Sequence, residues 1–132
     1  MHHILTPAGY ATLTRPLDLS LVDEATLALA RHIAVFGVFK ASPLVLRVEI
    51  AKTAALSPFR SALAEANAGL LAAGEKVGVA RLGKVAFAVR SARYEAAREA
   101  VKVASNDLEN ATKSVDYHIG ITTRLLGTPV AR

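Results

Sequence analysis

From residue 19 to residue 127, apolar residues recur at the three- and four-residue spacing that places them on one face of a helix. Two successive stripes of this kind are Leu44, Val48, Ala51 and Ala55, then Phe59, Leu63, Ala66 and Leu70. The chain has 132 residues, of which 52% are hydrophobic but only 5% aromatic, so its core must be built mainly from Ala, Val and Leu. Side chains this thin let helices approach closely. The pattern predicts an all-α protein with one core.

Cap and breaker residues divide this pattern into four to five helices. Starts are predicted at Ser20, Ser42-Pro43, Ser57-Pro58, Glu75 and Asn106, and stops at Gly74 and Gly127. The Ser20 hydroxyl would cap the first helix, with Asp23 at the third position, and this helix would run to about Lys40. The longest helix would extend over residues 75–105. The expected fold is a helical bundle over residues 19–132.

Two of the predicted helical segments have an unusual composition. Residues 44–50 are rich in β-branched side chains and could form a strand, but no partner strand is evident elsewhere, which favours a helix. The first predicted helix is apolar nearly all round, so more than one of its faces should be covered. Contact between copies of the chain would provide that cover.

Residues 1–18 are expected to form an extended N-terminal arm. Pro7, Gly9 and Pro16 interrupt any helix in this region, and threonines lie between them. An arm that has no core of its own must lie on the helical domain, on a neighbouring subunit or on a ligand.

Composition and hydropathy exclude several classes of protein. The chain contains no cysteine, which excludes disulfides, thiolate metal sites and a cysteine nucleophile. The most apolar stretch, residues 19–39, is interrupted by Asp23, Glu24 and Arg31, so no segment reaches the roughly 18 apolar residues of a membrane span. No secretory signal is expected, because residues 1–10 have no apolar core of the needed length.

No catalytic, metal or cofactor site is expected. The segment Gly78–Val85 has the glycines and lysine of a phosphate-binding P-loop, but Val85 stands where the Mg²⁺-binding hydroxyl belongs and no strand precedes it. Its glycines instead indicate close approach of another helix or a rigid ligand. None of the four histidines pairs with another ligand at helical spacing. No nucleophile, base and orienting group assemble, so neither enzymatic activity nor a small-molecule substrate is expected.

Charge gives the most informative functional signal. The formal net charge is +5, which suits an anionic partner. On a helical wheel drawn from residue 76, cations gather on one side, with Phe87 and Tyr94 among them, and an apolar seam that begins with Leu82 lies opposite. The cations of this basic face are Lys76, Arg81, Lys84, Arg90, Arg98 and Lys102. Further candidates in the middle of the chain are Arg47, Lys52 and Arg60.

This basic face has two interpretations. Lysine and arginine stems could shield Phe87 and Tyr94 on a surface that only water contacts. Alternatively, several cations along a rigid line could bind the phosphate backbone of a nucleic acid without reading its base sequence.

The layout of the whole chain resembles that of the major coat proteins of filamentous and rod-shaped archaeal viruses. The features that carry the resemblance are the arm at 1–18, the Ala-rich helices, the basic helical face and the ending Leu126-Gly127-Thr128-Pro129. The resemblance implies an all-helical subunit that wraps double-stranded DNA held in A form. It also implies assembly with copies of itself, or with a second homologous coat protein, into a helical filament.

The expected function is therefore that of a structural coat subunit, located in the virion, that packages double-stranded DNA through sequence-independent phosphate contacts. The alternative is a cytoplasmic helical adaptor that forms oligomers without nucleic acid and uses its apolar first helix as the partner surface. A small enzyme whose site is divided between subunits is a third class, since such a site leaves no pattern in one sequence.

Overall fold

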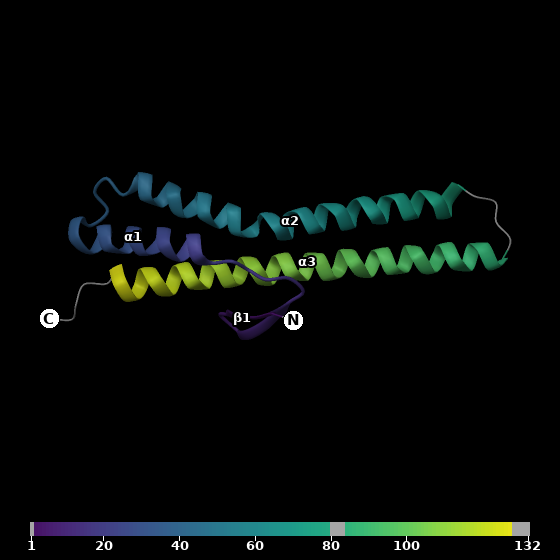
Figure 1. Ribbon diagram of the computed structural model, residues 1–132, viewed down its shortest axis with the longest axis horizontal. Helices are drawn as coiled ribbons and strands as arrows, with labels where there is room; N and C mark the ends of the chain where they lie inside the picture. Colours follow the sequence, from purple (N-terminus) through teal and green to yellow (C-terminus); the bar gives the residue numbers. More distant parts are fainter. Residues whose placement is uncertain (1, 80–83, 128–132) are drawn as a thin grey trace. The chain divides into compact units, whose positions relative to one another are not determined.

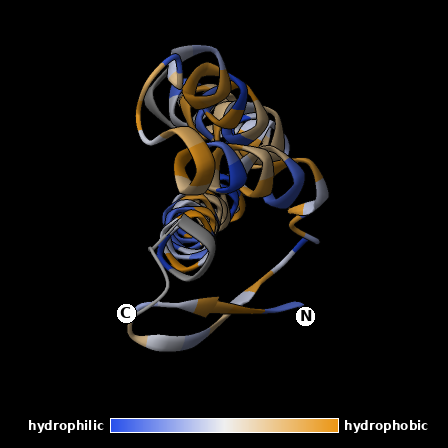
Figure 2. Cartoon of the chain, turned by 90° about the vertical axis from the view of Figure 1, so that its left-hand side faces the viewer, coloured by the Kyte–Doolittle hydropathy of each residue, from blue (hydrophilic) through white to orange (hydrophobic). Residues whose placement is uncertain are grey.

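The computed structural model describes residues 2–79 and 84–127, and within these it describes the side chains at 2–75 and 88–124. A short β-hairpin is followed by three helices (Figure 1). The elements are β1 (His2–Thr6), β2 (Gly9–Leu13), α1 (Ser20–Phe36), α2 (Ser42–Val79) and α3 (Lys84–Gly127). Hydrophobic and hydrophilic residues are interspersed along the helices (Figure 2). The predicted predominance of helix is confirmed, whereas the prediction of four to five helices is not.

The N-terminal segment that was predicted to be an extended arm is a hairpin over most of its length. β1 and β2 are antiparallel, with Thr6 opposite Gly9 and a turn at residues 7–8. Gly9 has a φ of +119°, which a residue with a Cβ rarely adopts, and its carbonyl accepts a 2.8 Å hydrogen bond from the Thr6 hydroxyl. Residues 14–19 form neither helix nor strand. The proline and glycine that argue against a helix here thus provide a turn between two strands.

Both ends of α1 differ from the prediction. At its start, the Asp18 carboxylate accepts hydrogen bonds from the Ser20 backbone N–H at 2.9 Å and from the Ser20 hydroxyl at 2.7 Å. Ser20 was predicted to be the cap, but it is the first residue of the helix. At the other end, α1 stops at Phe36 instead of Lys40, because Gly37 adopts a φ of +65° and turns the chain.

α2 and α3 run through positions that were predicted to break them. Pro58 and Gly74 lie inside α2, and Asn106 lies inside α3. Pro58 removes one backbone hydrogen bond, but Leu56 and Phe59 on either side of it are both buried. Burial of side chains before and after the proline therefore maintains a helix that local sequence signals would end.

Two further predictions concern these long helices. Residues 44–50 lie within α2, which confirms the helical interpretation of that β-branched segment. By contrast, the single helix predicted over residues 75–105 is wrong, because α2 ends at Val79 and α3 begins at Lys84. A helical wheel drawn continuously from residue 76 therefore combines two different helices.

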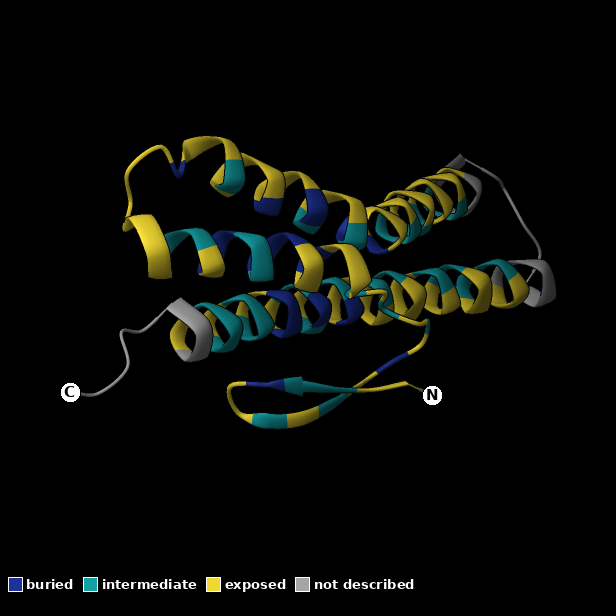
Figure 3. Ribbon diagram, turned by 60° about the vertical axis from the view of Figure 1, so that its left-hand side comes forward, coloured by how far each residue is buried: buried dark blue, intermediate teal, exposed yellow. Residues whose placement is uncertain are grey.

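The chain divides into two compact units. Unit 1 comprises the described residues up to Ser57 and from Glu109 onward, and so contains the hairpin, α1, the start of α2 and the end of α3. Buried segments occur on all three of these helical parts (Figure 3). The core of unit 1 includes Leu13, Val22, Leu29, Ala30, Val48, Leu56, Ala111 and Val115.

Ion pairs join the three helical parts of unit 1 to one another. They are Arg47–Glu24 between α2 and α1 at 3.0 Å, Lys52–Asp116 between α2 and α3 at 2.6 Å, and His118–Asp23 between α3 and α1 at 3.9 Å. The last pair is ionic only when the imidazole is protonated. Because all six side chains are partly exposed, each pair contributes at most about 1 kcal/mol, and the buried apolar side chains dominate the stability.

Unit 2 comprises Pro58–Leu108 and consists of the end of α2 and the start of α3. The two helical segments approach closely at Gly74, where a Cβ would lie 3.4 Å from Cε2 of the Tyr94 ring. Among the side chains described in this unit, only Phe59 and Asp107 are buried. As far as its side chains are described, unit 2 is therefore a helix pair with little core.

Candidate nucleic-acid interface

The structure distributes the predicted basic residues over both units. Arg60, Arg90, Arg98 and Lys102 lie in unit 2, and Arg47 and Lys52 lie in unit 1. The backbones of Lys76 and Lys84 belong to α2 and α3, respectively, so these two residues do not share a helix as predicted. Their side chains, and Arg81 entirely, lie outside the described residues.

The two faces of α3 in unit 2 are not arranged as the wheel predicted. The described members of its apolar seam, Val89, Ala92, Ala96 and Val103, are all exposed. Tyr94 was expected among exposed cations, but it is half-buried against Gly74. Over the described residues the prediction selected the wrong face for packing, because the seam there consists of Ala and Val side chains. An aromatic ring offers far more apolar surface to bury than alanine does.

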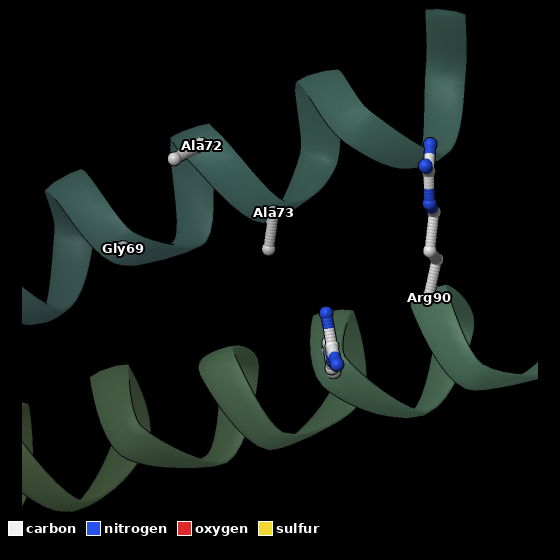
Figure 4. A pocket seen from close by; sticks show the side chains of 5 residues that line it. Gly69, Ala72, Ala73 and Arg90 are labelled. Atoms are coloured by element: carbon white, nitrogen blue, oxygen red, sulfur yellow. The ribbon is translucent and has the colours of Figure 1, made fainter. Parts of the chain in front are cut away.

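A recess of about 150 Å³ lies between α2 and α3 within unit 2. Its walls are Gly69, Ala72 and Ala73 on α2, and Arg90 and Arg93 on α3. Figure 4 shows the Arg90 side chain extending from α3 toward α2, and the Ala73 methyl group pointing toward α3. None of the described residues that line the recess carries a carboxylate. Two guanidinium groups therefore border a surface of backbone and methyl groups.

Local sequence explains this geometry. Residues three apart lie on the same side of a helix, so Arg90 and Arg93 project together from α3. Arg90 is half-buried and Arg93 is exposed, so the recess extends from the helix interface to the surface. On α2, the facing side chains are no larger than a methyl group, and nothing lies within 4 Å of the position that a Cβ on Gly69 would take. The space in front of the arginines therefore stays open.

Arg93 was not among the predicted phosphate contacts. The prediction grouped cations around a wheel and did not consider which residues of another segment would face each one. Two signals could have found Arg93. One is its three-residue spacing from Arg90, and the other is the cluster of small residues at 69–73, which predicts space opposite a packed helix.

The remaining predicted cations have different surroundings. In unit 2, Arg60 and Lys102 are exposed, and exposed Arg98 forms a 3.4 Å ion pair with Glu95 on its own helix. In unit 1, Arg47 and Lys52 pair with carboxylates of other helices. The unit 2 cations thus lie on an accessible surface, whereas Arg47 and Lys52 help to join the helices of unit 1.

The described residues offer few candidates for a nucleotide site, a metal site or a membrane span. The P-loop-like segment Gly78–Val85 includes residues 80–83, which lie outside the described residues. In the part of the chain that the structure describes, no group of three His, Asp or Glu side chains could hold a metal ion. Within the same residues, no helix is both long enough and apolar enough to cross a bilayer.

The chain matches no protein-family model, no curated protein and no solved structure. Its functional interpretation therefore depends on its own residues. Of the surfaces described, the arginine-lined recess has the most specific chemistry, because it places two neighbouring arginines beside space for an anion.

Proposed function

We propose that this chain is a structural subunit that packages double-stranded DNA by binding its phosphate backbone, and that it serves as the coat protein of a virion. The observation that carries the proposal is the recess in unit 2, where Arg90 and Arg93 face a wall of glycine and alanine. The proposed interface consists of these two arginines and the exposed cations of the same unit, Arg60, Arg98 and Lys102.

A backbone phosphate suits this recess in both charge and shape. A guanidinium presents a planar fork of N–H donors that matches two oxygens of a phosphate. The exposed Arg93 presents such a fork beside the half-buried Arg90, and the small residues opposite them leave room for the sugar–phosphate chain. That wall has no side-chain donor or acceptor that could read a base edge, so binding would not depend on DNA sequence.

Five cations on one unit set a scale for the salt dependence. Each phosphate that a cation neutralises contributes about 0.9 to the slope of log affinity against log salt concentration. If all five proposed cations contact phosphates, the slope should be about −4 to −5 per subunit. A filament in which many subunits bind side by side would multiply this dependence.

The test is binding of random-sequence duplex DNA to the full chain over a salt series. Replacing both recess arginines, Arg90→Ala with Arg93→Ala, should reduce the slope by about 2 and weaken binding equally for unrelated sequences. Lys113→Ala is the matched control, because Lys113 is also an exposed cation on α3 but lies in unit 1. An unchanged slope in the double variant would remove the recess from the interface.

A second measurement addresses packaging, because many proteins bind DNA without enclosing it. Electron microscopy of the chain with long duplex DNA should show filaments, and the DNA within them should resist nuclease. Charge reversal at Arg98 and Lys102, two exposed cations of the proposed interface, should abolish both results while the helical circular dichroism spectrum persists. Discrete complexes without filaments would contradict the coat role and leave DNA binding intact.

The exposed seam on α3 favours a second candidate function, a helical adaptor that assembles without nucleic acid. Val89, Ala92, Ala96 and Val103 form a strip of small apolar residues on which another helix could pack closely. This candidate predicts defined oligomers that nuclease leaves intact and that Val89→Asp with Val103→Asp dissociates. Such oligomers, together with no DNA binding at low salt, would favour the adaptor over the packaging subunit.

A further inference from the structure

The end of α1 and the turn that joins it to α2 present large apolar side chains to water. Val35, Phe36, Val38 and Phe39 have exposed fractions of 72%, 63%, 83% and 69%. Figure 3 shows nearly the whole turn as exposed, and Figure 2, which faces this end of the chain, shows hydrophobic residues along it. Proteins in water rarely leave two phenylalanines and two valines exposed together, so a patch of this kind marks a binding surface. We refer to residues 35–39 as the apolar tip.

The backbone of the apolar tip is held in a defined conformation. Gly37 and Lys40 have φ values of +65° and +55°, and Lys40 is the one residue other than glycine with positive φ in the described part of the chain. This conformation is unfavourable for a residue with a Cβ, so surrounding contacts must impose it. One such contact is a 2.6 Å hydrogen bond that His32 Nε2 donates to the Phe39 carbonyl. Because the tip is preorganised, less conformational entropy is lost when it binds.

The charged residues nearest the apolar tip in the sequence are cations. No Asp or Glu occurs in the sequence between Glu24 and Glu49, whereas Arg31, Lys40 and Arg47 all lie there. Arg47 pairs with Glu24 at 3.0 Å, while Arg31 is exposed. The Lys40 ammonium lies 5.4 Å from the centre of the Phe39 ring. A protruding apolar surface is therefore bordered by cations.

We propose that the apolar tip inserts into the surface of a lipid bilayer that carries anionic headgroups. Phenylalanine and valine side chains would enter the boundary between headgroups and acyl chains, while Lys40 and Arg31 would contact lipid phosphates. A second copy docked symmetrically through the same tip would bring these cations against their counterparts, which is unfavourable. The inference does not depend on DNA binding, because the tip lies in unit 1 and the arginine recess lies in unit 2.

A single-tryptophan variant tests the insertion directly. The chain contains no tryptophan, so Phe39→Trp provides one fluorescent reporter at the tip. Vesicles of phosphatidylcholine mixed with phosphatidylglycerol should shift its emission to the blue and protect it from an aqueous quencher. Vesicles of phosphatidylcholine alone should give a much smaller shift, because they lack the anionic headgroups that attract the cations.

Substitutions then assign the binding to the tip. Phe36→Ser with Phe39→Ser should weaken co-sedimentation with the anionic vesicles at least about tenfold, because two aromatic rings no longer enter the bilayer. Lys40→Gly accepts the positive φ and removes one charge, so it should weaken binding about fivefold. Leu71→Ser is the matched control, since Leu71 is 67% exposed but lies in unit 2, and Arg93→Ala tests for binding through the recess.

Three results would overturn the proposal. The first is co-sedimentation that the double serine variant leaves unchanged, with its helical spectrum intact. The second is a tryptophan emission that anionic vesicles do not shift. The third is a blue shift that rises with protein concentration in the absence of vesicles, which would assign the tip to a second copy of the chain.

Discussion

Unit 1 and unit 2 share the same two long helices, yet they bury side chains very differently. In unit 1, α1 adds a third helix to α2 and α3, and Val22, Leu56 and Val115 are fully buried. In unit 2, where α2 and α3 have no third helix, Phe59 and Asp107 are the only buried residues among those described. A pair of helices cannot cover its outer faces, so apolar residues there stay in contact with water.

The same two helices therefore contribute to a buried core in unit 1 and form exposed candidate binding surfaces in unit 2. The free energy of local opening follows the number of buried apolar contacts, so unit 2 should open more readily than unit 1. The arginine recess and the exposed α3 seam both lie in this less buried unit. We therefore expect a partner that binds unit 2 to stabilise it strongly, because binding to the folded form opposes local opening.

The largest expected effect comes from one leucine substitution made in each unit. Leu56→Ala in unit 1 should lower the free energy of unfolding by about 2–5 kcal/mol, because Leu56 is fully buried. Leu71→Ala, on the same helix in unit 2, should change it by less than about 0.5 kcal/mol, because Leu71 is 67% exposed. Urea denaturation followed by circular dichroism measures both. Similar losses in the two variants would mean that Leu71 is covered in solution, and the contrast between the units would fail.

A smaller effect tests whether the units open independently. Gly69 in unit 2 and Gly120 in unit 1 lie inside helices, and nothing occupies the space within 4 Å of a Cβ at either position. Alanine at each should therefore stabilise its helix by about 0.5–1 kcal/mol. Hydrogen exchange should slow in unit 2 for Gly69→Ala and in unit 1 for Gly120→Ala. Equal protection of both units by either variant would show that the chain opens as one cooperative block.

The sequence was sufficient to predict helix, because the three–four spacing of apolar residues persists through both units. It was a poor guide to helix ends, since Pro58 and Gly74 are strong local breakers that lie inside α2. Whether such residues end a helix depends on the burial of neighbours such as Leu56 and Phe59, which only the tertiary structure determines. The hairpin was missed for a related reason. Its turn residues were correctly identified as incompatible with helix, but strand pairing on either side of them was not considered.

The candidate site was only partly predictable. The helical wheel correctly treated residues three and four apart as neighbours, and one of the cations that it grouped, Arg90, lines the recess. It could not show that Tyr94 packs on Gly74, because that contact joins residues on different helices. Once Tyr94 faces α2, Arg90 lies at the helix interface and Arg93 lies beside it. The recess thus results from tertiary packing, and sequence periodicity alone favoured the opposite face of α3.

The smallest predicted effect is a pH dependence confined to unit 1. Hydrogen bonds from the Ser20 hydroxyl and then the Ser20 backbone N–H lower the pKa of Asp18 below its usual range. A folded-state pKa below the unfolded value stabilises the fold at pH values above the unfolded pKa of about 4, and this contribution is lost as pH falls through the folded pKa. Asp18→Asn keeps a side-chain oxygen at the start of α1 and removes the charge. The wild-type chain should therefore be slightly more stable than this variant at neutral pH, and the difference should vanish in strong acid. Hydrogen exchange at the start of α1 should report the change while exchange in unit 2 stays constant, and a pH-independent difference between the two proteins would show that the Asp18 charge does not stabilise the helix.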